Sequence, residues 1–394
     1  MIAAFKRILL EHGEHISAAA YDALDVPDKP GRSTLRREFG TWEEARAQAF
    51  PETQDIGRKE IVAQNQRLLD RLEKERNRSQ VFLDNCLASI SKRSFRPAHI
   101  PPITKAHESL EFHSLRSDAH VGDYTDTNWV QGLASYSKED YVERVGKWTE
   151  KIALFREQDH KSLGLNKLVI YHLGDQLTGE GIYDGQPFYL DLSLTDQLFK
   201  SVEVETNAVL ALAGIFPRIE MFCVIGNHGR PGRKGANHHR TNFDYLFYRA
   251  MKEALSRQKN VTVYVSESPT MLVQPGECNF ALTHGDAAQS WAGIPYYGRE
   301  REFMRLHSLY GVIVHYELVG HHHTPGNLGW SILMNGSLKG GDDLSVNNMR
   351  RQSLPSQEIF YFHPHHGINR RTTLNLADPV QLVPDEKGIM TAWV

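Results

Sequence analysis

The feature that most constrains the fold of this chain is a series of five short polar clusters, each of which follows an apolar, strand-like run. The clusters are Asp118-Ala119-His120, Gly174-Asp175, Gly226-Asn227-His228, His284-Gly285-Asp286 and Gly320-His321-His322-His323. Because the carboxyl ends of neighbouring strands in an α/β sheet open onto one crevice, we expect these side chains to meet at one site. Carboxylate, imidazole and amide oxygen are ligands of divalent transition metals, so the expected site is a metal centre.

Strand and helix patterns alternate through the chain from about residue 110. The expected strands are 112–115, 168–173, 221–225, 280–283, 312–319, 330–334 and 359–363, and the expected helices are 138–160, 192–216, 243–259 and 299–310. The later strands follow one another without helices between all of them. This order predicts an α/β fold in which layered sheets form a β-sandwich flanked by helices, and not a plain doubly wound sheet.

The composition limits the classes of function. With 45 basic and 48 acidic residues, the chain is not a globally basic nucleic-acid binder, so any such contact needs a local patch. Cys86, Cys223 and Cys278 lie in apolar surroundings at uneven spacing, which predicts buried thiols in a reducing compartment. The sequence has no run of about 18 apolar residues and no signal-peptide pattern, so we expect a soluble, cytoplasmic protein.

Residues 1–56 predict a small helical unit. Helices are expected at 2–10 and 16–24, then from an N-cap at Ser33 to Gly40, and finally at 42–49 behind an N-cap at Thr41. Short helices separated by tight turns fit a helix-turn-helix type of module.

The segment 33–45 within this unit resembles the small helical repeat associated with homing endonucleases. The resemblance implies DNA contact through the helix that carries Arg36 and Arg37, with Arg32 beside it. Residues 1–58 hold 8 basic and 10 acidic side chains, which opposes DNA binding. A helical cap or an oligomerisation unit is the alternative interpretation.

Residues 57–102 predict a long connecting helix over 58–91, followed by a proline-rich linker at 96–102. The helix carries a discontinuous apolar stripe, which favours a homodimer formed through this helix. Residues 58–80 hold seven basic and four acidic side chains, so a basic arm along nucleic acid is the other interpretation. Residues 103–394 are expected to form the catalytic domain.

The five clusters, taken in order, resemble the calcineurin-like metallophosphoesterase superfamily. The family pattern is D-x-H, G-D, G-N-H, a lone His and G-H-x-H, and the match covers about residues 110–345. Each string alone is weak, but all five in order, after apolar runs and with helix-length gaps between them, form a specific signal. The resemblance implies a two-metal phosphoesterase.

The resemblance also implies a role for each cluster. The ligands of the first ion are Asp118, His120 and His323, those of the second are Asn227, His284 and His321, and Asp175 bridges both. A hydroxide that bridges the two ions attacks phosphorus in line, and His228 protonates the leaving oxygen or stabilises the transition-state charge. Manganese suits such a mixed imidazole and carboxylate set, while iron, zinc, nickel and magnesium stay open.

Departures from the family pattern narrow the branch of the family that this chain resembles. The protein Ser/Thr phosphatases carry Asp-Arg-Gly after the bridging aspartate and an acid after G-N-H, and this chain has neither. Three segments, Gly226 to Arg230, His284-Gly285-Asp286 and Asn335 to Gly340, instead resemble metallophosphoesterases encoded by bacteriophages and prophages. Those enzymes are often likened to DNA-repair exonucleases, and the resemblance implies a bacterial host cell. Arg230, Arg233 and Lys234, directly after His228, are expected to grip a phosphate backbone or to form an ordinary solvated loop.

Three functions follow from these observations. The favoured one is a two-metal phosphodiesterase that acts on DNA as a nuclease. The alternative is a phosphoesterase for nucleotides, cyclic nucleotides or other small phosphoesters, with the N-terminal unit used for assembly. A non-catalytic DNA-binding or scaffold protein is disfavoured because metal ligands are present in all five clusters. The sequence leaves open exonuclease or endonuclease action and single- or double-stranded substrate.

Overall fold

The computed structural model describes most of the chain. The residues described are 1–13, 16–91, 110–232, 234, 238–288, 295–378, 382–384, 388 and 390–392, with the side chains of 51–61, 79, 83, 86, 89–91, 382, 383 and 390–392 not described. The predicted linker at 96–102 therefore lies outside the described residues. The chain divides into two compact units, Met1–Pro102 and Ile103–Val394.

The first unit begins with four short helices around a small core. They are α1 (Ile2–His12), α2 (Ala18–Asp22), α3 (Arg32–Phe39) and α4 (Trp42–Ala49). Their buried residues are Phe5, Ile8, Leu9, Tyr21, Leu35, Ala45 and Ala49. Thr41 caps α4 as predicted, and Glu44 completes a reciprocal capping box with it. The predicted cap at Ser33 was wrong, because α3 already begins at Arg32 behind Gly31.

The long helix α5 spans Pro51–Ser91, and a proline suits its first position because an N–H there has no partner within the helix. Large apolar side chains along α5 are exposed by more than half: Val62, Leu68, Leu69, Leu72, Val81, Phe82 and Leu87. We call these seven residues the α5 stripe. A single helix cannot bury an apolar stripe against itself, so the α5 stripe needs a partner outside this helix.

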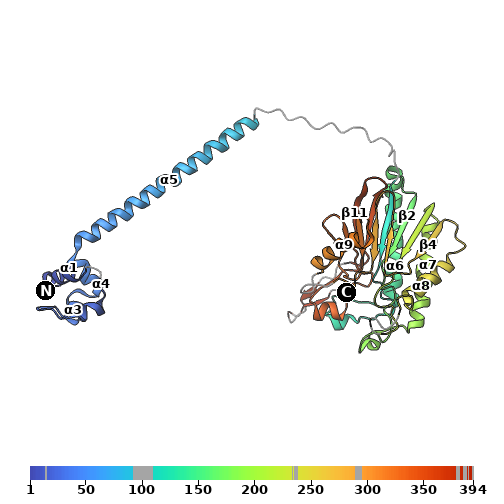
Figure 1. The fold of residues 1–394 in the computed structure, drawn as a ribbon, viewed down its shortest axis with the longest axis horizontal. Helices are drawn as coiled ribbons and strands as arrows, with labels where there is room; N and C mark the ends of the chain where they lie inside the picture. Colours follow the sequence, from blue (N-terminus) through green and yellow to red (C-terminus); the bar gives the residue numbers. More distant parts are fainter. Residues whose placement is uncertain are drawn as a thin grey trace. The chain divides into compact units, whose positions relative to one another are not determined.

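The second unit contains two mixed sheets (Figure 1). The first has the order β11-β10-β1-β2-β3-β4, from β1 (Glu111–Arg116), β2 (Lys167–His172), β3 (Arg218–Cys223), β4 (Val261–Val265), β10 (Ser356–His363) and β11 (Gly367–Asn375). The second has the order β5-β6-β7-β9-β8, from β5 (Thr270–Val273), β6 (Phe280–Thr283), β7 (Tyr316–Val319), β8 (Gly326–Leu328) and β9 (Ile332–Met334). A short pair, β12 (Leu382–Pro384) and β13 (Met390–Ala392), stands apart from both sheets.

Helices cover the outer faces of these sheets. They are α6 (Lys138–Leu163), α7 (Leu194–Ala213), α8 (Phe243–Ala254) and α9 (Tyr296–Tyr310), and the short turns are η1 (Thr127–Val130), η2 (Gln186–Tyr189) and η3 (Leu344–Asn348). Helices α6, α7 and α8 lie on one side of the sheets and α9 lies on the other (Figure 1). Among the described residues, no helix is both long enough and apolar enough to span a membrane.

The alternation of side chains along the strands explains the layers. In β2, Leu168 and Ile170 face the core beneath α6–α8, whereas Val169 and Tyr171 face the core between the two sheets. Because both faces are covered, β2 is apolar at every position from Leu168 to Tyr171. The predicted α/β sandwich flanked by helices is confirmed.

Some predicted boundaries were wrong. The strand expected at 312–319 begins only at Tyr316, because Val312 and Ile313 are exposed in the turn after α9. Cys223 and Cys278 are buried free thiols, while the side chain of Cys86 lies outside the described set.

Candidate metal centre

The five polar clusters meet where strands of both sheets end. Strands β1, β2 and β3 of the first sheet lead into Asp118-His120, Asp175 and Asn227-His228. Strands β6 and β7 of the second sheet lead into His284 and into His321-His323. Parallel strands direct their carboxyl ends to one edge of a sheet, and the sandwich brings these edges together.

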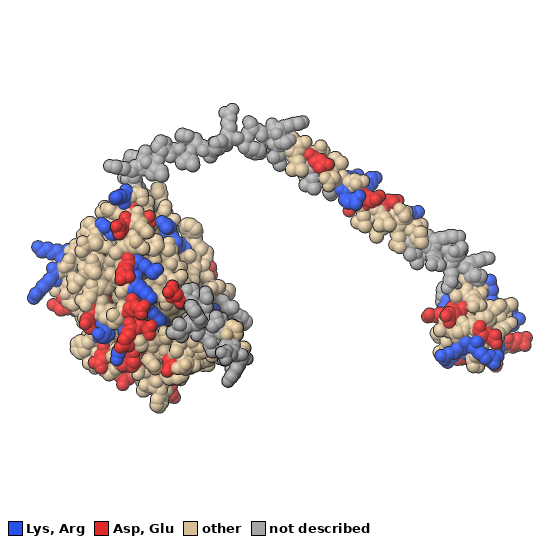
Figure 2. Space-filling model, turned by 180° about the vertical axis from the view of Figure 1, so that it is seen from behind, with Lys and Arg blue, Asp and Glu red and all other residues tan. Residues whose placement is uncertain are grey.

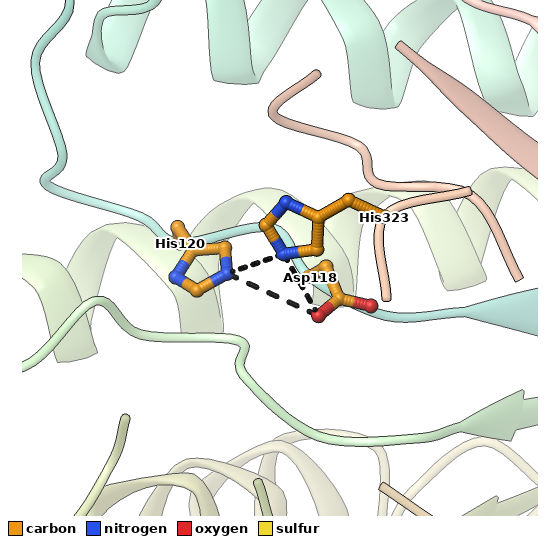
Figure 3. Close-up of side chains that lie close together, drawn as sticks. All are labelled: Asp118, His120 and His323. Atoms are coloured by element: carbon orange, nitrogen blue, oxygen red, sulfur yellow. Dashed lines mark hydrogen bonds and ion pairs between the residues drawn. The ribbon is translucent and has the colours of Figure 1, made fainter. Parts of the chain in front are cut away.

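One group of ligand atoms consists of Asp118, His120 and His323 (Figure 3). His120 Nε2 lies 3.1 Å from His323 Nε2, and His323 Nε2 lies 3.2 Å from Asp118 Oδ1. Asp118 is fully buried, and Figure 3 shows the two rings turned toward its carboxylate. These are the three residues expected around the first ion.

A second group consists of Asp175, His284 and His321. His284 Nε2 lies 2.9 Å from Asp175 Oδ2 and 3.2 Å from His321 Nδ1. Asn227 Oδ1 joins this group at 3.0 Å from His284 Nε2. These four residues are the ones expected around the second ion, with Asp175 as the bridge.

Asp175 also reaches toward the first group. Its Oδ2 lies 3.9 Å from His120 Nε2, and Asp175, His120 and His228 form a further set whose ligand atoms are all within 4.8 Å of one another. Asp175 therefore lies between the two groups, which is the position that its expected role requires.

The donor set fits divalent transition metals. Burial lowers the pKa of both His120 and His321, in the case of His321 to about 4, so both imidazoles are neutral and able to donate a lone pair. For His284, burial acts against the charged form, but the nearby Asp175 and Asp118 outweigh it and raise the pKa to about 10. A cation at this point would take the place of that proton.

The backbone is left-handed at most of these ligands. Of the eight non-glycine residues with positive φ in the described part of the chain, five are Asp118 (54°), His120 (46°), Asp175 (53°), His321 (67°) and His323 (52°). Such conformations are uncommon for residues with a side chain and concentrate at functional sites. The turns at the strand ends thus direct these side chains toward the site, and the left-handed backbone that does so costs conformational energy.

Two glycines allow the loops to approach one another. Gly174 has φ 89°, and a Cβ on it would lie 2.4 Å from the main-chain nitrogen of Gly226. A Cβ on Gly226 would lie 2.1 Å from Asp175 Oδ1. A larger residue at Gly174 would therefore displace the backbone of Gly226, and a larger residue at Gly226 would displace the Asp175 carboxylate.

Asp244 ties these two loops together, and sequence reasoning missed it. Its buried carboxylate accepts main-chain N–H bonds from four residues: Asp175 (2.9 Å), Gln176 (3.1 Å), Leu177 (3.1 Å) and Gly226 (3.0 Å). Burial and the proximity of Asp175 raise the pKa of Asp244 to about 6, although the N–H bonds work in the opposite direction. The only available signal was its place in the first turn of a helix, behind the N-cap Asn242.

His228 has a fixed orientation despite the missing acid after G-N-H. Its main-chain N–H donates to Asp175 Oδ1 at 2.7 Å, and its Nδ1 lies 3.1 Å from the carbonyl oxygen of Thr178. The ring packs edge-on against His120, with centroids 4.6 Å apart. The carbonyl of Thr178 therefore fixes the ring in the absence of that acid.

Two of the three basic residues expected to bind substrate already have partners. Arg230 donates to the carbonyl oxygens of Asn227 and Gly232, which shapes its own loop. Lys234 forms an ion pair of 2.8 Å with Asp286. Nδ1 of His284 lies 2.7 Å from the carbonyl oxygen of Leu173, so this carbonyl and not Asp286 orients the imidazole. Arg233 lies outside the described residues.

The arginines expected to bind DNA lie in the first unit, on α3. Arg32 pairs with Asp22 at 3.1 Å, Arg37 pairs with Glu38 at 3.5 Å, and Arg36 is exposed. On the face shown in Figure 2, basic and acidic side chains are interspersed over the second unit. That face offers no single basic surface.

Comparison with known proteins gives distant structural matches. No protein-family profile matches the chain. No curated protein is significantly similar to it either. A 5′-nucleotidase from Candida albicans SC5314 matches with a TM-score of 0.30 and 11% identity, over 70% of this chain and 53% of that one, so the match spans about half of the nucleotidase. A phosphopantetheinyl hydrolase from Mycobacterium tuberculosis matches with a TM-score of 0.24 and 12% identity, over 63% of this chain and 97% of that one.

Proposed function

We propose that this chain is a metal-dependent phosphodiesterase of the metallophosphoesterase type, with two metal sites. The observation that carries the proposal is the convergence of two ligand groups on a shared carboxylate, Asp175, at the strand ends of both sheets. Two divalent ions, for which manganese is our choice, would supply Lewis acidity to the phosphoryl oxygens.

The side chains around the ligands have separate tasks. The Thr178 carbonyl accepts a hydrogen bond from Nδ1–H of His228, which selects the tautomer whose Nε2 is unprotonated until the ring gains a second proton. His228 thus exchanges a proton at Nε2, and in the charged form it donates that proton to the leaving oxygen. Asp244 holds the loops of Asp175 and Asn227 at a fixed separation.

We propose DNA as the substrate because the α3 segment resembles a DNA-associated repeat and Arg36 is exposed on it. One observation favours the second candidate, a phosphoesterase for small nucleotides. Arg230 and Lys234, the cations beside His228, are already engaged within the protein, which leaves less positive charge for a long phosphate backbone.

A substrate panel tests the proposal. Purified protein with Mn²⁺ is assayed against linear and circular DNA, cyclic and linear mononucleotides, and bis-p-nitrophenyl phosphate. We expect diester cleavage that Asp175→Asn abolishes, whereas His365→Ala, a change at an exposed histidine outside the site, leaves it intact. Cleavage of small diesters but of no form of DNA would favour the nucleotide phosphoesterase. Full activity in Asp175→Asn would overturn the metal assignment.

A further inference from the structure

Aromatic side chains gather on the two loops that follow the first ligands. The loop after His120 carries Tyr124 and Trp129, and the loop after Asp175 carries Tyr183, Phe188 and Tyr189. Trp129 is 42% exposed, Tyr183 is 49% exposed and Phe188 is 84% exposed. We call these five residues the aromatic rim. Single exposed rings are ordinary on a protein surface, whereas several on two adjoining loops form a patch that suits a contact surface.

The two loops hold one another in place. The main-chain N–H of Tyr124 donates to the carbonyl of Tyr189 at 2.8 Å, and Asp123 forms an antiparallel bridge with Leu190. The Trp129 ring lies edge-to-face against Tyr124 and Tyr189, with centroids 5.7 and 5.6 Å apart. These rings are therefore ordered before any ligand arrives, which lowers the entropy lost on binding.

Tyr183 brings the rim to the metal centre. Its ring centroid lies 6.5 Å from that of His228, at an interplanar angle of 77°. The loop is fixed behind it by the buried Gln186, whose amide donates to the Thr178 carbonyl at 2.9 Å and accepts from the Ile182 N–H at 2.9 Å. A group bonded to a phosphate at the metal centre would thus meet Tyr183 beside His228.

The charge of these loops shows which part of a nucleotide they suit. Segments 121–137 and 178–191 contain no Lys or Arg and five acidic residues: Asp123, Asp126, Glu180, Asp184 and Asp191. Lys339 pairs with Asp123, but the other four acidic residues would repel a row of backbone phosphates. Flat, uncharged groups would stack on the exposed rings without that penalty.

We infer that the aromatic rim is a nucleobase subsite, in which Tyr183 and Trp129 stack on an unpaired base next to the scissile phosphate. This rests on the proposed phosphodiesterase activity. It sharpens that proposal, because a base held in a duplex has both faces covered by its neighbours and is not free to stack. The substrate class is therefore a single-stranded end, a flap or a free nucleotide.

The test compares two diesters that share a leaving group, thymidine 5′-(p-nitrophenyl phosphate) and methyl p-nitrophenyl phosphate. The readout is the ratio of their kcat/KM values. We expect Tyr183→Leu and Trp129→Leu to lower this ratio about 10- to 100-fold, mainly through KM for the thymidine ester. Tyr183→Phe, which keeps the ring, should retain it. Phe199→Leu, on α7 and 68% exposed, is the matched control for loss of a surface ring.

An unchanged ratio in both leucine variants would overturn the inference, even if their affinity for a protein partner fell. Binding of thymidine 5′-monophosphate, measured by calorimetry with Mn²⁺ present, separates this outcome from failure of the proposed function. If wild type cleaves neither ester but Tyr183→Leu binds the nucleotide at least 10-fold more weakly, the subsite stands and the phosphodiesterase proposal fails. Equal binding by wild type and variant would overturn the subsite.

Discussion

The main-chain N–H of His228 donates a 2.7 Å hydrogen bond to Oδ1 of Asp175, so the turns that carry the proposed proton donor and the proposed bridging ligand are linked directly. Because the contact uses the backbone, it survives removal of the imidazole. A variant at His228 therefore changes proton transfer without moving Asp175.

The first prediction follows from that contact. His228→Ala should lower kcat about 10²- to 10⁴-fold, the usual contribution of a general acid, while the protein still binds two ions. Metal content by mass spectrometry and kcat on the same preparation provide the check. Loss of one ion in His228→Ala would instead make His228 a ligand, as its grouping with His120 and Asp175 allows.

The second prediction concerns Asp244. Asn in its place offers an amide NH₂ to backbone N–H groups that need an acceptor, so the loops of Asp175 and Gly226 should loosen. We expect Asp244→Asn to weaken Mn²⁺ binding about 10- to 100-fold in a calorimetric titration. Asp196→Asn, at an exposed position in the first turn of α7, is the control. Equal Mn²⁺ affinities of Asp244→Asn and Asp196→Asn would show that Asp244 does not support the metal site.

The third prediction is a pH dependence of stability that arises at His172. Burial, with a further contribution from Arg116, lowers the pKa of this imidazole to about 3. Because the pKa of His172 in the folded protein lies below its pKa in the unfolded chain, the contribution of this imidazole to stability is fully present above about pH 6.5. It is lost progressively as the pH falls toward 3. His172→Leu should remove up to about 1.4 kcal/mol of this loss per pH unit. Urea denaturation at pH 7 and at pH 5 gives the change in unfolding free energy for each protein. Equal changes in wild type and His172→Leu would contradict the prediction.

The fourth prediction concerns the homodimer that we propose to form through the α5 stripe. Leu69 and Leu72 are each more than half exposed, and charges placed there should separate a dimer into monomers in analytical ultracentrifugation. Ala63→Lys, about 2.5 turns away from Leu72, adds a charge on the opposite side of the helix and should leave the dimer intact. A wild-type protein that sediments as a monomer at all concentrations would refute the assembly.

The fifth prediction tests DNA contact by α3. Arg36→Glu should weaken binding of a fluorescent duplex and reduce the slope of log affinity against log salt by about 1. Arg7→Glu, which reverses an exposed charge on α1 of the same unit, should have a smaller effect. Equal losses in the two variants would indicate nonspecific attraction only.

The sequence predicted which polar clusters come together, because candidate metal ligands are short polar interruptions after apolar strands and both signals are local. The strand ends at Asp118, Asp175 and His284 lie where the apolar runs predicted. Asp244 escaped prediction because it acts through the N–H groups of residues far away in the chain, which carry no side-chain signal. The Ser33 cap failed for a different reason: Gly31, one residue before the helix, is also a permitted N-cap.

The two ligand groups each draw on both sheets. Asp118 and His120 follow β1 of the first sheet, whereas their companion His323 follows β7 of the second, and Asp175 meets His284 in the same way. A cation bound there would link the two sheets to each other at the edge where strands of both sheets end. Withdrawing it with a chelator should therefore let the sheets part at that edge, so metal supply would govern how long the protein survives as well as how fast it works.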